Sequence, residues 1–395
     1  MSTRRKTCVV TGSRAEYGLL LPLLRRIEAS KLLSLQIVAT GMHLSPEFGL
    51  TYRNIEADGF RIDDRVEMLL SSDTSVGVTK AVGLGVIGLA DVFGRAPPDV
   101  VVLLGDRFET FAAAQAAFLA RLPIAHLHGG ESTEGAFDDS LRHAITKMAH
   151  LHFVAAAPYR DRVIQMGESP ERVFQVGALG LDNIGALDVL PKAAVEERLE
   201  VRLGTPTFLV TYHPVTLATE GPGRALRALF DALDAFPNAS VVMTGSNADP
   251  SGRVIERAMR DYAEQRPGRA AFRTTLGHHL YLNTMRFADV VVGNSSSGLI
   301  ETPALGKPTV NLGERQGGRL RGPSVIDCVE EASAIRSALE RALSDEFRSR
   351  LDPRENPYGV GGGIAQKIVS VLEQADLGAL RMKRFHDLPP NEVGR

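Results

Sequence analysis

The 395-residue chain has no tryptophan and only two cysteines, Cys8 and Cys328. Two cysteines so far apart in sequence predict neither a disulfide framework nor a zinc site, and they fit a reducing cytoplasm. The chain also lacks a large excess of charge, since its formal net charge is −2. No basic surface is expected to neutralise a nucleic-acid backbone, so nucleic acid is not expected as a partner.

Long apolar runs are missing as well, so no membrane-spanning segment and no membrane partner are expected. The basic N-terminal residues precede a very short apolar run and a polar turn, which predicts a first strand and no signal peptide. With 44% hydrophobic and 23% charged residues, the composition is typical of a globular protein. A length of 395 residues suggests two domains.

Short apolar stretches alternate with helical stretches, which is the pattern of parallel sheets covered by helices on both faces. One set of expected strands covers residues 7–11, 35–40, 100–104, 124–127, 151–154 and 173–176. A second set covers residues 207–211, 240–243, 270–273, 290–293 and 309–311. The predicted fold class is therefore α/β, with two Rossmann-like, doubly wound domains.

A glycine-rich turn and a charged helix separate the two sets of strands. We expect an N-terminal domain over residues 1–178 and a C-terminal, nucleotide-binding domain over residues 179–362. A last helix over residues 363–382 is expected to pack back on the first domain. The polar residues 383–395 are expected to form a frayed tail.

Two motif-like patterns carry little weight. GLGVIG at residues 83–88 matches a dinucleotide fingerprint by its letters, but no strand precedes it, so a closely packed helix is expected. The spacing of His126 with His128, and of His150 with His152, points both rings of each pair to one side. Metal ligation by either pair is an open alternative, but no third ligand with metal spacing is evident, and no metal is predicted.

TGSRAEYG at residues 11–18 predicts a strand end, a tight turn and a helix start. The free amides of the helix start, with Arg14 beside them, suit a phosphate or another anion. The alternative is a capped helix in which Arg14 pairs with a carboxylate.

Asp106, Arg107 and Glu109 follow the apolar run VVVLLG. An acid at the carboxyl end of a buried parallel strand lies at the mouth of the ligand crevice, where its pKa can move toward neutrality. The alternative is that Asp106 only caps the following helix.

The richest stretch is HLHGGESTEGAFDDSLRHAITKMAH at residues 126–150. A glycine-containing loop can bring Glu131 toward Asp138 and Asp139, and Arg142 lies one helical turn further on. One aspartate could be merely a helix cap, but with Asp106 these acids are more than capping needs. Clustered acids of this kind favour catalysis by proton transfer.

In the second half, His213 follows the strand at residues 207–211. VVGNSSSGLIE at residues 291–301 offers hydroxyls and free amides for a diphosphate, and Glu301 can accept both hydrogen bonds of a ribose diol. The glycines of NLGERQGGR could let backbone approach a ligand, or could form an ordinary surface loop.

These residues together resemble the UDP-N-acetylglucosamine 2-epimerase family, and within it the hydrolysing branch that serves sialic and legionaminic acid synthesis. TGSRAEYG, GDRFE, HLHGGE, DDSLRHAITKMAH, HPVT, GNSSSG and NLGERQGGR occur in family order over nearly the whole chain. The resemblance implies a glycosyltransferase-B-type fold, with the nucleotide sugar in the cleft between two Rossmann-type domains and no metal or redox cofactor.

The resemblance also implies a reaction, in which anti elimination of the nucleotide gives a glycal and hydration gives the 2-epimeric free sugar. The residues it implies as catalytic are Asp106, Glu131, Asp138 and His213, where His213 contacts or protonates the diphosphate. The implied substrate-binding residues are Arg14, His43, Arg107, His128, Arg142, Ser296, Ser297 and Glu301. Which carboxylate serves elimination and which serves hydration stays open.

One position departs from the family pattern. His128 stands where many members carry a catalytic glutamate, and Glu131 can take over that role in a sub-branch with the HxHGGE motif. The expected substrate is UDP-N-acetylglucosamine, which would give N-acetylmannosamine, and the alternative is UDP-2,4-diacetamido-2,4,6-trideoxyglucose. A non-hydrolysing epimerase is a weaker alternative. The apolar helix expected at residues 76–93 is a candidate homodimer interface.

Overall fold

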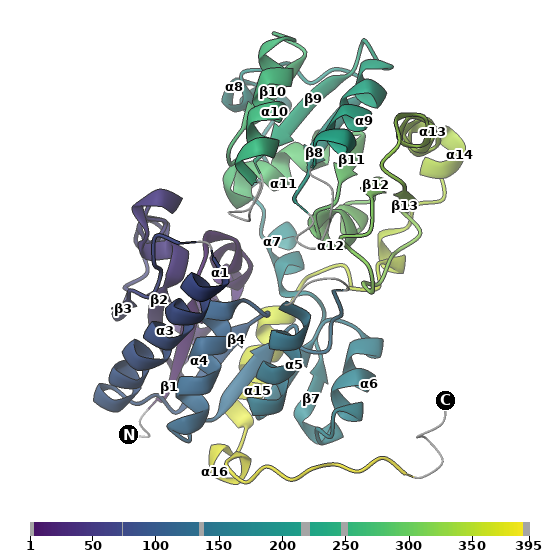
Figure 1. The fold of residues 1–395 in the computed structure, drawn as a ribbon. Coiled ribbons are helices and arrows are strands. Elements are labelled where there is room, and N and C mark those ends of the chain that lie inside the picture. Colours follow the sequence, from purple (N-terminus) through teal and green to yellow (C-terminus); the bar gives the residue numbers. More distant parts are fainter. Residues whose placement is uncertain (1–3, 73, 134–137, 215–221, 246–251, 390–395) are drawn as a thin grey trace. The chain divides into compact units, whose positions relative to one another are not determined.

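The computed structural model describes residues 4–72, 74–133, 138–214, 222–245 and 252–389. These residues form two compact units, each built on one parallel sheet (Figure 1). Unit 1 holds the described parts of residues 1–131, 137–183 and 361–395, and unit 2 holds those of residues 132–136 and 184–360. The α/β fold class is confirmed.

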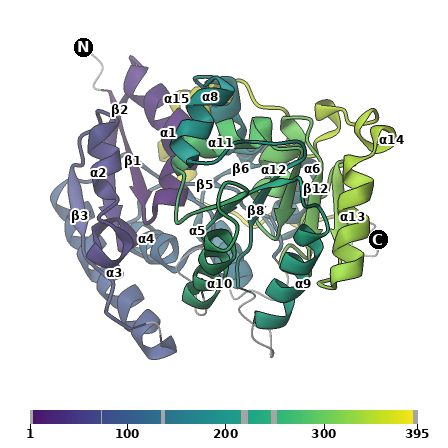
Figure 2. The ribbon, with the colours of Figure 1, turned by 90° about the horizontal axis from the view of Figure 1, so that it is seen from above.

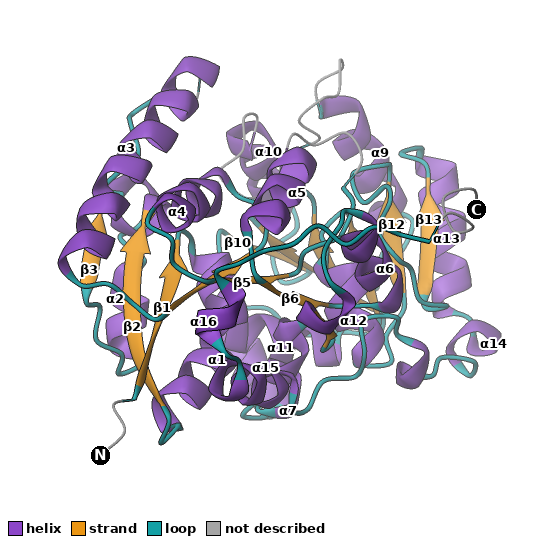
Figure 3. Ribbon diagram, turned by 90° about the horizontal axis from the view of Figure 1, so that it is seen from below, coloured by secondary structure: helices purple, strands orange, loops and turns teal. Residues whose placement is uncertain are grey.

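Unit 1 contains a seven-stranded sheet in the order β3-β2-β1-β4-β5-β6-β7, and its neighbouring strands are parallel. The strands are β1 (Arg5–Thr11), β2 (Leu33–Thr40), β3 (Asp64–Val66), β4 (Val100–Leu104), β5 (Ile124–Leu127), β6 (Leu151–Val154) and β7 (Val173–Gln175). Figure 3 shows β1 and β2 side by side. The strand order reverses between β1 and β4, and such a switch point is where open α/β sheets bind ligands.

Unit 2 contains a six-stranded parallel sheet in the order β10-β9-β8-β11-β12-β13. Its strands are β8 (Thr207–Thr211), β9 (Ser240–Thr244), β10 (Ala270–Arg273), β11 (Val290–Gly293), β12 (Thr309–Leu312) and β13 (Val325–Cys328). The order reverses between β8 and β11, so this unit has a switch point of its own.

Helices connect the strands of both sheets. Unit 1 has α1 (Arg14–Ala29), α2 (Tyr52–Ala57), α3 (Ser75–Arg95), α4 (Phe108–Leu119), α5 (Asp138–Met148), α6 (Ala157–Gln165), α15 (Ile364–Gln374) and α16 (Leu377–Leu380). Unit 2 has α8 (Lys192–Leu199), α9 (Gly223–Asp234), α10 (Gly252–Glu264), α11 (Gly277–Phe287), α12 (Ser297–Ala304), α13 (Ala332–Leu343) and α14 (Asp345–Arg348), and α7 (Asp182–Gly185) begins at the end of unit 1. The 3-10 helices are η1 (Gly41–Leu44), η2 (Pro46–Phe48), η3 (Pro170–Arg172), η4 (Leu179–Leu181) and η5 (Pro353–Glu355).

Successive residues of a strand pack into hydrophobic cores on opposite faces of the sheet, because side chains alternate along a strand. In β8, Phe208 and Val210 pack with apolar residues of α9, α10 and α13, whereas Leu209 packs with those of α8 and α11. In unit 1, Cys8 and Val10 of β1 pack with residues of α3, α4 and α5. Helices therefore cover both faces of the second sheet, as the sequence predicts, and the Cys8 and Val10 face of the first sheet.

The last long helix, α15, belongs to unit 1 and contacts α1. Its first turn is held by Asp182, whose carboxylate accepts hydrogen bonds from the amides of Gly362 (2.8 Å), Ile364 (3.1 Å) and Ala365 (2.7 Å). The chain thus returns to unit 1 after unit 2 is complete, and one aspartate fixes the point of return.

One helix of the described part of the chain, α3, is long and apolar enough to cross a membrane by its length and composition. Lys80 and Asp91 interrupt its apolar residues, so α3 does not contradict the expectation that long apolar runs are missing. The helix lies beside α4 (Figure 2), and Leu89, Val92 and Phe93 belong to the core of unit 1. GLGVIG falls inside α3, as predicted. A Cβ on Gly85 would lie 2.9 Å from Met68 Cε, so the predicted close packing is found at Gly85, whereas a Cβ on Gly83 would meet no atom within 4 Å.

Candidate functional site

The start of α1 is capped by its own residues. Ser13 Oγ accepts from the amide of Glu16 at 3.4 Å, and the Glu16 carboxylate accepts from the amide of Gly12 at 2.9 Å and the hydroxyl of Thr110 at 3.1 Å. Burial, and after it the charge of Glu109, raises the pKa of Glu16 to about 7. Arg14 is exposed, and no carboxylate of the described residues lies within ion-pair distance of it. The cap that this alternative expects is present, and among the described residues Arg14 has no carboxylate partner.

The carboxyl end of β4 carries Asp106. The preceding Gly105 has φ +77°, a conformation that suits glycine, and its carbonyl accepts from His126 Nε2 at 2.8 Å. Helix α4 begins two residues after Asp106, with Arg107 as N-cap and no side-chain cap, so Asp106 is not used for capping. The half-buried Asp106 carboxylate instead forms an ion pair with Arg142.

Arg142 joins three parts of this cluster. Its guanidinium, 2% exposed, donates to Asp106, to Asp139 at 3.2 Å and to the carbonyl of Glu131 at 2.8 Å. Asp138 opens α5 next to Asp139, while residues 134–137 of the preceding loop lie outside the described residues. The structure therefore brings the strand end of β4 and the start of α5 together, as the sequence predicts.

Arg107 belongs to the same strand end. Its Nε lies 3.2 Å from Glu109 Oε2, and the Glu109 side chain is 1% exposed. The Glu109 carboxylate raises the pKa of Arg107 above its usual range, and Asp138 contributes in the same direction. Arg107 is thus a fixed cation within reach of the Asp138 charge.

His43 and His128 have protein partners on both ring nitrogens. His43 is fully buried between the hydroxyls of Thr11 (3.1 Å) and Thr51 (2.9 Å), and burial lowers its pKa to about 4. His128 Nδ1 lies 2.6 Å from Glu131 Oε1, and its Nε2 accepts from the amide of Leu179 at 3.3 Å. Both ring nitrogens of His43 and of His128 are thus engaged within the protein.

The histidine pairs considered for a metal have partners within the protein. His126 contacts the Gly105 carbonyl and Thr146 Oγ1, His150 Nδ1 accepts from the amide of Ile124, and His152 Nε2 lies 3.0 Å from Glu168. No group of three or more His, Cys, Asp or Glu side chains in the described ranges could hold a metal ion.

In unit 2, Asn294 joins the ends of β8 and β11. Its side chain accepts from the amide of His213 at 2.7 Å and donates to the His213 carbonyl at 2.9 Å. Its own carbonyl accepts from Arg315 at 3.0 Å and Gln316 at 2.8 Å. Burial, and after it the charge of Arg315, lowers the pKa of His213 to about 3, so the imidazole is neutral near pH 7. Val215 and Thr216 of HPVT lie outside the described residues.

The start of α12 carries the polar residues expected for a nucleotide. Ser296 is the N-cap residue and makes no side-chain cap hydrogen bond, and Ser297 Oγ lies 2.7 Å from the hydroxyl of Tyr281. Glu301, 8% exposed, lies on the first turns of this helix. Sequence reasoning missed Asn294, Arg315 and Tyr281 as parts of this cluster, although Arg315 stands within the NLGERQGGR string.

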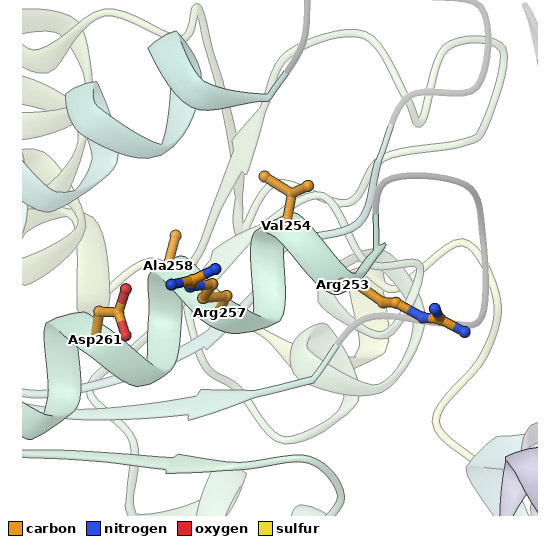
Figure 4. Close-up of a pocket in the computed structure, with 5 residues that line it drawn as sticks. All are labelled: Arg253, Val254, Arg257, Ala258 and Asp261. Carbon is orange, nitrogen blue, oxygen red and sulfur yellow. The ribbon is translucent and has the colours of Figure 1, made fainter.

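A surface depression lies elsewhere on unit 2, along one helix (Figure 4). Its lining residues, Arg253, Val254, Arg257, Ala258 and Asp261, all belong to α10. None of the residues expected to act or bind lies there, so the strand ends are the better candidates for chemistry.

Comparison with known proteins agrees with this arrangement. The family model described as UDP-N-acetylglucosamine 2-epimerase matches residues 25–373. A "GDP/UDP-N,N'-diacetylbacillosamine 2-epimerase (hydrolyzing)" of Campylobacter jejuni is 40% identical over 98% of this chain and 100% of its own length. A "UDP-N,N'-diacetylbacillosamine 2-epimerase (hydrolyzing)" of Legionella pneumophila is 36% identical over 86% of this chain and 89% of its own length.

The fold is also that of solved structures. The UDP-GlcNAc 2-epimerase of Neisseria meningitidis bound to UDP-GlcNAc has a TM-score of 0.80 at 18% identity, covering 94% of this chain and 100% of that one. The two parallel sheets thus form the predicted glycosyltransferase-B-like fold. From the family match over most of its length and from its relatives, the chain belongs to the UDP-N-acetylglucosamine 2-epimerase family.

Proposed function

We propose that this protein is a hydrolysing 2-epimerase that converts UDP-2,4-diacetamido-2,4,6-trideoxyglucose and water to UDP and the free 2-epimeric sugar. The observation that carries the proposal is the 40% identity, over 98% of the chain, to a relative named for this activity on N,N'-diacetylbacillosamine. UDP-N-acetylglucosamine, the substrate first expected from the sequence, is the second candidate, because the matching family model is named for it.

The unit 1 residues suit elimination followed by hydration. In the first step a carboxylate takes the C2 proton, the C1–O bond to the nucleotide breaks and a C1–C2 double bond forms. In the second step a carboxylate takes a proton from water as the water oxygen bonds to C1, the C1–C2 double bond becomes a single bond, and a carboxylic acid gives a proton to C2 from the opposite face. No carbonyl group acidifies the C2 proton, so its transfer needs positioned acids and bases. We assign these roles to Asp106, Glu131 and Asp138.

The departing diphosphate needs positive charge and hydrogen-bond donors. We assign this part to the residues expected to bind the nucleotide, which are Arg14, Arg107, His213, Ser296 and Ser297. A neutral His213 would act as a hydrogen-bond donor, since burial lowers its pKa to about 3. Glu301 would hold the ribose diol. None of these steps requires a metal or redox cofactor.

Proton NMR in deuterium oxide tests the proposal. The purified protein is incubated with the UDP-linked diacetamido sugar and, separately, with UDP-N-acetylglucosamine. From the diacetamido substrate we expect free UDP and the free 2-epimeric sugar with deuterium at C2. Its kcat/KM should be roughly tenfold or more above that for UDP-N-acetylglucosamine, because the second substrate lacks one group that contacts the protein. Preference for UDP-N-acetylglucosamine would select the second candidate, and a UDP-linked epimer as product would exclude hydrolysis.

We also propose that the protein is a cytoplasmic homodimer that pairs through α3. The outer face of α3 exposes Val76, Leu84 and Ile87, at 61%, 42% and 65%. Gly83 lies on the same face, where an added Cβ would meet no other atom. Apolar exposure of this kind is typical of surfaces that bind another protein.

A further inference from the structure

His128 lies directly after β5, between a carboxylate and a backbone amide. Its φ is +64°, in the left-handed region that few non-glycine residues adopt. Nδ1 is 2.6 Å from Glu131 Oε1, and Nε2 is 3.3 Å from the amide nitrogen of Leu179 in η4. All three residues belong to unit 1.

These two contacts fix the position of the proton on the ring. A backbone amide can only donate, so Nε2 must be the unprotonated acceptor of the Leu179 N–H. A carboxylate oxygen at 2.6 Å from Nδ1 requires a proton between them, and Nδ1 carries it. One neutral tautomer therefore satisfies both contacts, and the charged ring would lose the hydrogen bond from Leu179.

We propose that His128 is a positioning residue that acts only through Nδ1–H, and that Glu131 is the carboxylate that meets the substrate at this strand end. Both ring nitrogens are engaged within the protein, so the imidazole itself does not transfer the C2 proton. The inference rests on the proposed function, because it names which of two neighbouring groups takes part in elimination or hydration. It also explains how a histidine can stand at a position expected to hold a glutamate.

The tautomer can be measured without any substrate. Long-range ¹H–¹⁵N correlation spectra of the imidazole rings are recorded at pH 7.5 for the wild-type protein and for His128→Asn, and the signals missing from the variant belong to His128. A protonated Nδ1 and an unprotonated Nε2 are expected. A protonated Nε2, or a charged ring, would overturn the proposal whether or not the protein turns over a nucleotide sugar.

Two amide variants then separate the two ring nitrogens. The side-chain amide of asparagine superimposes on Nδ1, and that of glutamine superimposes on Nε2. We expect His128→Asn to keep kcat within about tenfold, and His128→Gln and Glu131→Gln each to lower kcat about 100-fold, the usual loss of an acid or base. KM should stay near wild type in all three. Equal activity of His128→Asn and His128→Gln, or near-normal activity of Glu131→Gln, would contradict the assignment.

Discussion

Arg142 donates from the first turns of α5 to the carboxylate of Asp106 at the end of β4, 36 residues earlier in the chain. Its guanidinium is almost fully buried and also holds Asp139 and the Glu131 carbonyl, so its planar fork fixes the proposed catalytic acids relative to one another.

Replacing Arg142 should therefore affect both stability and turnover. Arg142→Ala leaves Asp106 and Asp139 without their buried partner, and we expect the free energy of unfolding to fall by about 3 kcal/mol. Arg142→Lys keeps the charge but has one nitrogen in place of the planar guanidinium, so it cannot hold the three acceptors in the same geometry. We therefore expect kcat to fall about 100-fold, as for a misplaced catalytic group. Urea unfolding and steady-state rates measure the two effects. Arg53→Ala, on the exposed surface of α2, is the matched control and should change neither.

Asp106→Asn should lower turnover by at least about 100-fold, because an amide cannot exchange a proton with C2. UDP affinity should be largely unchanged, since the nucleotide contacts are assigned to other residues. Rate measurements and calorimetric titration with UDP test this, with Asp91→Asn on the surface of α3 as control. Near-normal turnover would remove Asp106 from the mechanism.

Glu301→Gln should weaken UDP binding by roughly 10- to 100-fold, the value of a hydrogen bond to a charged group. Titration of the wild type with 2′-deoxy-UDP should show a comparable loss, because one hydroxyl of the diol is gone. The variant should bind UDP and 2′-deoxy-UDP almost equally. A variant that still prefers UDP would place the ribose elsewhere.

Buried histidines predict a loss of stability in mild acid. Burial lowers the pKa of His150 to about 4 and that of His126 to about 3, against an unfolded value near 6.5. Above pH 6.5 each is neutral in both states. Below pH 6.5 each histidine binds a proton in the unfolded chain but stays neutral in the folded protein. Each histidine therefore lowers the free energy of unfolding by up to about 1.4 kcal/mol per pH unit, until the pH reaches its pKa in the folded protein.

Unfolding curves between pH 4 and pH 7.5 measure this slope. His150→Asn keeps an acceptor for the Ile124 amide and removes the titrating ring, so it should reduce the slope between pH 6.5 and pH 4. An unchanged slope would show that His150 already titrates normally in the folded protein.

The α3 proposal is tested by Ile87→Asp, at a side chain that is 65% exposed. A charge at the centre of an apolar helix pairing should convert the dimer to a monomer, with a change of at least about 100-fold in the dimer dissociation constant. Sedimentation velocity measures the mass of each form. Arg95→Asp, at the end of the same helix, should have a much smaller effect, and a monomeric wild-type protein would refute the interface.

The sequence predicted the central strands because they are continuous buried apolar runs, and β4, β5 and β6 have the expected bounds. It missed two edge strands, which are β3 in the first sheet and β13 in the second. β3 has only three residues, two of them charged, and β13 contains Asp327, so neither shows an apolar run.

The candidate site was predictable where residues follow strand ends, as with Asp106 and His213, since the carboxyl ends of parallel strands share one edge. Contacts that depend on side-chain geometry could not be predicted from the sequence. Asn294 looks like an ordinary polar turn residue, yet its amide joins two strand ends, and Ser13 with Glu16 occupies the helix start expected to be open. Pairings of this kind depend on rotamers and on distances between loops.

The hold of Asp182 on the first turn of α15 has a consequence for how the protein is made. The described strands of unit 2 lie between residues 207 and 328, so they are synthesised before α15. The helix that packs on α1 is synthesised only after these strands. Until then α1 lacks its contact with α15, so we expect part of its surface to be exposed to chaperones on a nascent chain.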